Sequence, residues 1–236
     1  MKRLLVVNAD DFGRSDGIND GVAAAHEHGI VTSASLMVRW PAAADAAAYA
    51  RAHPALGVGL HVDLGEWERR DGTWHVVYEV AGALEAGREV RAQLDRFRDL
   101  VGRDPTHLDS HQHVHREGPA AGALAELGVE LGVPVRSDSA IHYCGSFYGA
   151  DAGGVPLLDL IRPEALAALV AGLPEGATEL ACHPAARVDL ASSYADQRML
   201  EVAALCSPAV RAAVEWGQVE LCDFRAAAAA VRQWSA

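Results

Sequence analysis

Between Thr106 and His115 the chain reads T-H-L-D-S-H-Q-H-V-H, with histidine or aspartate at every second position. In an extended strand, side chains two residues apart project to the same face, so this pattern loads one face with metal-binding groups. Because such positions lie roughly 6.6 Å apart along a strand, five of these groups cannot reach one ion. We expect one or two to bind a divalent metal together with residues distant in sequence; the alternative is a histidine-rich surface loop.

Other side chains of this kind stand where short apolar runs end. The run Arg3 to Ala9 is typical of a strand buried on both faces, and two aspartates follow it directly. Residues 57 to 63 alternate as a strand does, and the apolar run 178 to 182 is followed by His-Pro. The carboxyl ends of parallel strands meet at one edge of a sheet, so these polar groups should converge there. The residues expected at that edge are Asp10, Asp11, His61, His111 and His183.

One aspartate and two histidines from different strands form a ligand set that Zn²⁺ accepts, with positions left open for water and substrate. A second carboxylate beside the first can act as general base on a water held there. Asp10 and Asp11 would point to opposite sides of a regular strand, so a turn or bulge must aim both at the site. For either aspartate the alternative role is a helix N-cap. His183 could donate a proton to a leaving group, although lone histidines such as His183 and His107 are more often structural.

The elements that must position these groups follow from periodicity and end signals. Strands are expected at 3–9, 30–38, 57–63, in the histidine stretch, and at 133–136, 178–182 and 219–222. Helices are expected from Ser15 to about Gly29 and at 41–53, 84–101, 120–131, 163–173, 196–206, 208–216 and 223–234. Strands alternating with helices predict an α/β fold with a mostly parallel sheet that tends to close into a barrel. The length of 236 residues suits a single domain covering 1–236.

Residues 64–84 show no strong period and are expected to form a long loop. The loop contains Trp67, Trp74 and Tyr78, and loops over strand ends often build substrate sites. Its aromatic rings could stack on a sugar ring, or they could plug the rim of a barrel; the sequence leaves both readings open.

Composition excludes some classes of partner. A formal net charge of -12 would repel nucleic acid and an anionic membrane surface. No apolar stretch is long enough to span a membrane, and the run after Met1 stops too early for a secretory signal. Four cysteines without C-x-x-C spacing predict reduced thiols in a cytoplasmic protein. The oligomeric state stays open, with a homodimer as one alternative.

Seven segments together resemble the YdjC-like family, whose best-known members are chitooligosaccharide deacetylases and which has relatives associated with hopanoid biosynthesis. They occur in the family's order over nearly the whole chain, and their combination is specific. The segments are N-A-D-D-F-G at 8–13, G-I-V-T-S-A-S at 29–35, G-L-H-V-D-L at 59–64, T-H-L-D-S-H-Q-H-V-H at 106–115, F-Y-G at 147–149, C-H-P-A at 182–185 and D-Q-R-M-L-E at 196–201.

The resemblance implies a distorted (β/α) barrel similar to polysaccharide deacetylases and metal-dependent removal of an N-acetyl group from an amino sugar. It implies that Asp11, His61 and His111 hold one divalent ion, Zn²⁺ or Mg²⁺, that Asp10 is the base and that His183 is the acid. His113 and His115 would not be metal ligands in this match. Residues expected to contact the N-acetylated sugar are His113, His115, Arg136, Tyr148 and Trp67; for Arg136 and Tyr148, as for Arg198 and Glu201, the alternative is that they brace the mouth.

Two features depart from the family pattern. Gln112 stands where many relatives have another histidine, and the 64–84 segment is short beside that of the chitooligosaccharide enzymes, which bears on the substrate. Two other functions remain alternatives: a metal-dependent hydrolase of a phosphoester or cyclic amide, and a sugar- or metal-binding protein without catalysis. A spare carboxylate argues against mere binding, and two-metal phosphoesterases usually need more carboxylates than Asp63 and Asp109 add.

Overall fold

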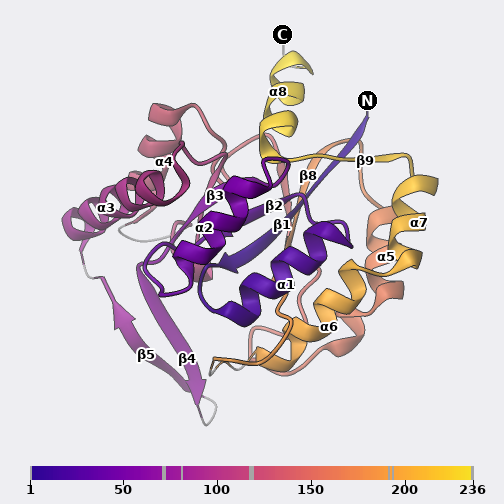
Figure 1. Cartoon of the computed structure of the whole chain (residues 1–236), viewed down its shortest axis with the longest axis horizontal. Coiled ribbons are helices and arrows are strands. Elements are labelled where there is room, and N and C mark those ends of the chain that lie inside the picture. The colour runs from indigo at the N-terminus through magenta and orange to yellow at the C-terminus, as the bar shows by residue number, and fades with distance from the viewer. Residues whose placement is uncertain are drawn as a thin grey trace.

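A curled, parallel sheet forms the centre of the molecule, and helices surround it (Figure 1). The computed structural model describes residues 2–70, 73–80, 82–116, 120–190, 192 and 194–234. The main sheet has seven strands in the order β6-β3-β2-β1-β8-β7, and β9 pairs with β1. Its strands are β1 (Arg3–Phe12), β2 (Ser33–Leu36), β3 (Gly57–Val62), β6 (Leu108–Ser110), β7 (His142–Cys144), β8 (Gly176–Cys182) and β9 (Val219–Leu221).

The helices lie where the sequence periodicity predicted them, with ends that differ by a few residues. They are α1 (Asp16–Glu27), α2 (Ala43–Ala52), α3 (Ala83–Val101), α4 (Ala120–Leu131), α5 (Pro163–Ala171), α6 (Ala195–Leu205), α7 (Pro208–Trp216) and α8 (Phe224–Trp234). Short 3₁₀ turns are η1 (His111–His113) and η2 (Leu158–Ile161).

Local chemistry explains the helix ends. The Ser15 hydroxyl accepts a hydrogen bond from the Ile18 amide at 3.2 Å and caps α1, as the sequence predicted. Helix α3 ends at Gly102, which has φ 78°, a left-handed conformation that suits glycine. Val90, Leu94 and Phe97 lie on one face of α3, and this face is buried.

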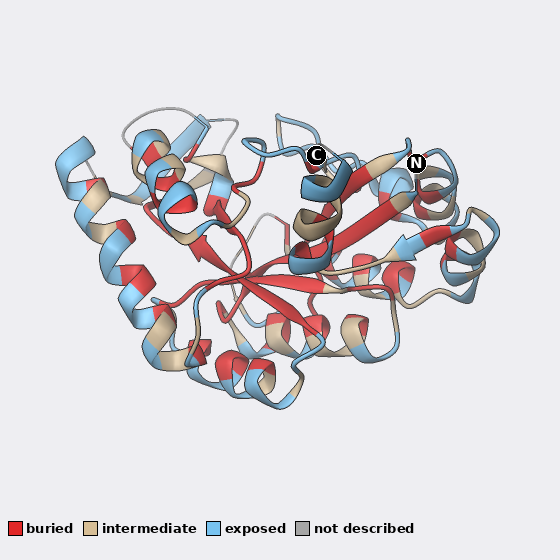
Figure 2. Cartoon of the chain, turned by 90° about the horizontal axis from the view of Figure 1, so that it is seen from above, coloured by how far each residue is buried: buried red, intermediate tan, exposed pale blue. Residues whose placement is uncertain are grey.

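Strand β1 lies in the interior of the sheet, and its residues from Leu4 to Phe12 are buried. It pairs in parallel with β8 over Arg3 to Ala9, with β9 over its first residues and with β2 over its last. Figure 2 shows the buried strands running through the centre, with exposed residues on the outer faces of the helices. The α/β fold with a mostly parallel, barrel-like sheet is confirmed, whereas the single-domain assignment stays a prediction.

One predicted strand of the main sheet is absent, and one of its strands was not predicted. Residues 133–136 form no named strand; Val135 makes one parallel bridge to Leu108 at the edge of the sheet. The strand next to β8 is β7, and its residues lie within a segment of weak pattern. The histidine stretch is extended only as far as Ser110, where the chain turns into η1 with Gln112 and His113 at φ 50° and 55°.

The 64–84 segment is not a loop. Strands β4 (Gly65–Arg70) and β5 (Thr73–Glu79) form an antiparallel hairpin that projects from the body of the molecule (Figure 1). The two residues between the strands, Asp71 and Gly72, lie outside the described residues. An Asp-Gly pair is itself a strong sequence signal for a two-residue hairpin connection.

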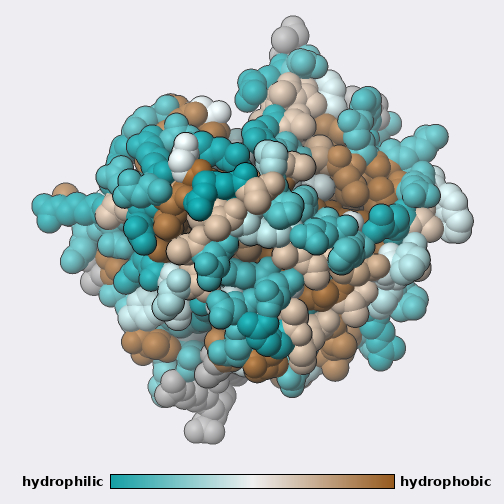
Figure 3. All heavy atoms as spheres, viewed as in Figure 1, coloured by the Kyte–Doolittle hydropathy of each residue, from teal (hydrophilic) through white to brown (hydrophobic). Residues whose placement is uncertain are grey.

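Hydrophilic side chains are spread over much of the face in Figure 3, with smaller groups of hydrophobic ones between them. Among the described residues, no helix is both long enough and apolar enough to cross a membrane. In the same part of the chain, all four cysteines are free thiols.

Candidate metal centre

A bulge at the end of β1 brings both aspartates to one cavity. Pairing with β2 runs in register from Asn8 to Ala9 and resumes, shifted, at Phe12. Asp11 has φ 64°, an uncommon conformation for a residue with a side chain. The bulge expected from the sequence is therefore present, and both Asp10 and Asp11 line the cavity.

Asp11, His61 and His111 come together, although they lie far apart in sequence. Each offers one donor atom, and these atoms all lie within 4.8 Å of one another. The Asp11 Oδ1 atom is 3.5 Å from His61 Nε2 and 3.0 Å from His111 Nδ1. All three residues are buried. They project from the ends of β1 and β3 and from η1, which follows β6.

This donor set fits a divalent metal ion. His61 Nδ1 lies 2.8 Å from Asp109 Oδ1, which fixes the ring so that Nε2 faces Asp11. Burial lowers the pKa of His61, but the ion pair with Asp109 outweighs it and raises the pKa to about 10. The cluster therefore attracts positive charge at this point, and a metal cation can take the place of the imidazole proton. One carboxylate with two imidazoles suits Zn²⁺ and also admits Mg²⁺.

A second group of donors, Asp10, His61 and Asp109, already holds a cation of the protein itself. The Arg136 guanidinium pairs with both oxygens of Asp10 at 2.7 Å and lies 2.8 Å from Asp109. It also pairs with Glu179 at 2.6 Å. Because this guanidinium already pairs with the carboxylates of the second group, we expect one metal ion rather than two.

Arg136 and His115 lie beneath the cavity. The Arg136 side chain is 0% exposed and is absent from the residues lining the cavity, which favours the bracing alternative over a substrate contact. His115 lies between the Ser110 hydroxyl and the Arg136 carbonyl, at 2.6 and 3.1 Å, and is absent from the residues lining the cavity. Both side chains brace the floor of the site.

His107 is a core residue. Its ring stacks on Phe224 with ring centres 3.8 Å apart, and a Cβ at Gly59 would lie 2.4 Å from the His107 ring.

His183 follows β8 and faces Asp10, with 3.8 Å between Nε2 and Oδ2. Burial lowers the pKa of His183 to about 4, so its imidazole is neutral near pH 7. Its Nδ1 atom has no hydrogen-bond partner among the described residues. Glu201 accepts from the His183 amide and from the Tyr194 hydroxyl, and Arg198 donates to Asp11. Arg198 lines the cavity, while Glu201 braces it from behind.

The cavity above these groups has a volume of about 400 Å³, enough for a small sugar. The hairpin supplies one wall through Trp67 and Trp74, and Tyr143 and Tyr148 lie among the other lining residues. Of the expected substrate contacts, Trp67, His113 and Tyr148 line the cavity. Tyr148 stacks on Tyr194 with ring centres 4.3 Å apart, which holds its ring in place.

Sequence reasoning missed Glu66 and Arg14. Glu66 Oε2 lies 3.0 Å from His111 Nε2 and accepts from Arg14 at 2.6 Å. Both residues line the cavity. The Asp-Gly pair at 71–72 is the sequence signal that could have found them, because it favours a β-hairpin. Residues 64–84 interpreted as a hairpin place Glu66 at the start of a strand.

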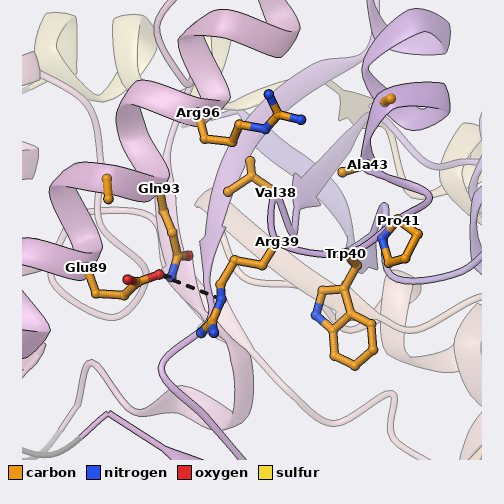
Figure 4. A pocket seen from close by; sticks show the side chains of 10 residues that line it. Val38, Arg39, Trp40, Pro41, Ala43, Glu89, Gln93 and Arg96 are labelled. Carbon is orange, nitrogen blue, oxygen red and sulfur yellow. Dashed lines mark hydrogen bonds and ion pairs between the residues drawn. The ribbon is translucent and has the colours of Figure 1, made fainter.

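A second cavity of about 490 Å³ lies between the start of α2 and α3 (Figure 4). Figure 4 shows the Trp40 indole at its edge and the Arg39 side chain directed toward Glu89, an ion pair of 3.7 Å. The Arg14 guanidinium lies 5.2 Å from the centre of the Trp40 ring and reaches the first cavity. Trp40 therefore lines the second cavity and also contacts Arg14, which lines the first.

Comparison with known proteins shows the family to which the chain belongs. The family model described as "YdjC-like protein" matches residues 4–215. The chain belongs to this family. Curated relatives include a carbohydrate deacetylase of Geobacillus stearothermophilus, 35% identical, with 95% of this chain and 98% of the relative covered. A chitooligosaccharide deacetylase of Enterobacter sp. (strain 638) is 32% identical, with 91% and 95% covered.

Solved structures show the same architecture. A protein of Enterococcus faecalis V583 named for cellobiose-phosphate cleavage superposes on this YdjC-like chain with TM-score 0.77 at 25% identity, covering 96% of this chain and 99% of the other. The peptidoglycan deacetylase PdaC of Bacillus subtilis superposes with TM-score 0.57 at 12% identity, covering 99% and 94%. At that identity the second likeness concerns the fold alone.

Proposed function

We propose that this protein is a metal-dependent hydrolase that removes the N-acetyl group from an amino sugar. The observation that carries the proposal is the meeting of Asp11, His61 and His111 around one point, with Asp10 beside them held by a different partner. The names of the YdjC-like relatives, carbohydrate and chitooligosaccharide deacetylase, supply the substrate class.

The metal ion, Zn²⁺ or Mg²⁺, would be held by Asp11, His61 and His111. When bound, it supplies Lewis-acid polarisation of the acetyl carbonyl and of a water molecule. Asp109 holds the His61 ring, and the buried setting keeps bulk water away from these ligands.

Asp10 is the proposed general base. Burial opposes ionisation of its carboxyl group, but the Arg136 ion pair outweighs burial and lowers the pKa of Asp10. The group is therefore a carboxylate near neutral pH, ready to accept a proton from the attacking water. The bidentate pair with Arg136 also fixes its orientation.

His183 is the proposed general acid. Its lowered pKa means that the ring is neutral before the reaction, so it must first gain the proton that Asp10 takes from the attacking water; His183 Nε2 lies 3.8 Å from Asp10 Oδ2. Negative charge that develops on the attacked acetamide raises the affinity of a neighbouring imidazole for a proton. The protonated ring can then donate to the departing amine.

Cavity residues outside this group would bind the sugar. The Trp67 ring offers a face for stacking, and His113 and Tyr148 line other parts of the cavity. A cytoplasmic location, expected from the scattered cysteines, is also proposed, and a homodimer remains an open expectation.

Acetate release from a panel of N-acetylated mono- and disaccharides tests the proposal. The protein is stripped with a chelator and assayed before and after addition of Zn²⁺ or Mg²⁺. We expect release only with metal and only from N-acetylated sugars. Release of phosphate from sugar phosphates, with no release of acetate from any panel member, would contradict the proposed reaction.

A further inference from the structure

The His111 ring lies between two carboxylates. Its Nδ1 is 3.0 Å from Asp11 Oδ1, on the side of the metal-binding group, and its Nε2 is 3.0 Å from Glu66 Oε2 on the opposite side. His61 shows the same arrangement, with Asp109 behind it at 2.8 Å. Histidine ligands in metal sites commonly donate their second ring N–H to a carboxylate, which fixes the ring and increases its basicity.

Glu66 reaches this position from the β4–β5 hairpin, outside the main sheet. Asp63 holds the base of the hairpin: its carboxylate accepts from the Tyr78 hydroxyl of β5 at 2.7 Å and from Trp40 Nε1 at 3.0 Å. Asp63 is 1% exposed, so these bonds are shielded from water. Trp40 in turn supports Arg14, which pairs with Glu66.

Gln112 holds the hairpin a second time, close to Glu66. Its side-chain amide accepts from the Trp67 backbone N–H at 3.1 Å and donates to the Trp67 carbonyl at 3.0 Å. It also donates to Glu66 Oε1 at 3.3 Å. Gln112 adopts φ 50° directly after His111, so the turn that orients His111 also binds the hairpin.

We propose that Glu66 is a positioning residue of the metal centre: its carboxylate holds the His111 ring with Nδ1 toward Asp11 and His61, and the Gln112 contact with the hairpin keeps the carboxylate there. The hairpin is therefore part of the metal site as well as a wall of the sugar cavity. This inference rests on the proposed metal-dependent function, and its test reads metal binding directly.

The test measures Zn²⁺ affinity of the full chain by competition with a chromophoric chelator. Glu66→Ala should weaken binding about 10- to 100-fold, and Glu66→Gln, which keeps an acceptor for the His111 N–H, should recover part of the loss. Glu79→Ala is the matched control, because Glu79 is an exposed carboxylate at the end of β5 in the same hairpin; its affinity should equal that of the wild type. Gln112→Ala keeps the carboxylate but removes its support, and should give an intermediate loss.

Removing Glu66 also leaves the Arg14 charge beside the site, with Nη1 3.5 Å from His111 Nε2. The double variant Glu66→Ala/Arg14→Ala separates this effect, since affinity should stay low if ring orientation is the cause. Full recovery in the double variant would overturn the inference. In the Co²⁺-loaded protein, the visible absorption bands should change in Glu66→Ala and not in Glu79→Ala.

The inference would also be overturned if Glu66→Ala bound Zn²⁺ as tightly as the wild type does, or if the wild type bound no Zn²⁺. Failure of the proposed function looks different: the wild type would bind Zn²⁺, Glu66→Ala would weaken that binding, and acetate would not be released from any N-acetylated sugar.

Discussion

Asp10 and Asp11 are neighbours in the chain, yet their side chains have separate partners. Asp11 faces His61, His111 and Arg198, while Asp10 forms an ion pair with Arg136. The bulge in β1 produces this division, because it directs adjacent side chains to different parts of one cavity. The two carboxylates can therefore serve different purposes, and substitutions at them and their partners should give different results.

Asp10→Asn should keep the metal and lose turnover. Asparagine still accepts a hydrogen bond from Arg136, but it cannot take a proton from water, so acetate release should fall about 100-fold or more. His111→Ala should lower metal content and acetate release together, since it removes a ligand. Atomic absorption and an acetate assay distinguish the two; near-normal release by Asp10→Asn would rule out the assigned base.

Glu201 should make stability depend on pH. Burial raises the pKa of its carboxyl group to about 7, so the folded protein holds a proton that the unfolded chain releases near pH 4.5. The stabilisation from this group is present below pH 4.5 and is lost as pH rises through 7, a change of up to about 3 kcal/mol.

The comparison with Glu201→Gln measures that change. Glutamine does not titrate, so the unfolding free energy of the wild type minus that of the variant should fall between pH 5 and pH 8 in urea denaturation. A difference independent of pH would show that Glu201 ionises normally in the folded state.

At the scale of elements, helix α1 follows the β1 bulge directly, and its first turn is fixed by a cap. Ser15→Ala removes the acceptor for the Ile18 amide and should lower the unfolding free energy by about 1 kcal/mol. Ser15→Asp restores an acceptor and should remain close to the wild type. Urea denaturation gives both values; equal loss in the two variants would indicate that the hydroxyl packs rather than caps.

The hairpin should contribute to sugar binding through its exposed aromatic face. Trp74 lines the cavity and is 56% exposed, so Trp74→Ala should raise KM about fivefold while changing stability little. Val76→Ala is the control, since Val76 is equally exposed on the same strand and does not line the cavity. Steady-state kinetics on an N-acetylated disaccharide measure KM for both variants. An unchanged KM in Trp74→Ala would place the sugar away from Trp74.

At the scale of the whole molecule, the metal centre joins parts of the sheet that are distant in sequence. The proposed ligands come from β1, β3 and the turn after β6, so a bound ion would add a direct link between segments that the sheet already joins. An ion that binds the folded chain alone stabilises it, by about 2.7 kcal/mol at a concentration 100 times Kd.

Metal removal should therefore lower the melting temperature. For a chain of this size the stabilisation corresponds to a Tm shift of about 5 °C or more. Thermal unfolding of the stripped protein, with and without added Zn²⁺, measures it, and His111→Ala serves as the control that should not respond. An equal Tm increase in His111→Ala would place the stabilising ion elsewhere.

Much of the architecture could be read from the chain before its structure was known. Apolar runs and helical stripes are local patterns, so they marked the helices and most central strands, and the Ser15 and Gly102 signals marked helix ends. The residue types of Asp10, Asp11, His61 and His111 identified the candidate donors, because few side chains bind metals. Their position after strands indicated that they would share one edge.

Tertiary structure decided which groups pair with which. Strand β7, the burial of Arg136 under Asp10 and the contact of Glu66 with His111 depend on residues tens of positions apart, and no local period records such pairing. A buried charge is stable only where opposite charges surround it, and that surrounding exists only once the sheet has curled. The sequence by itself determined the helices, most strands of the main sheet and the supply of donor groups, whereas folding determined their partners.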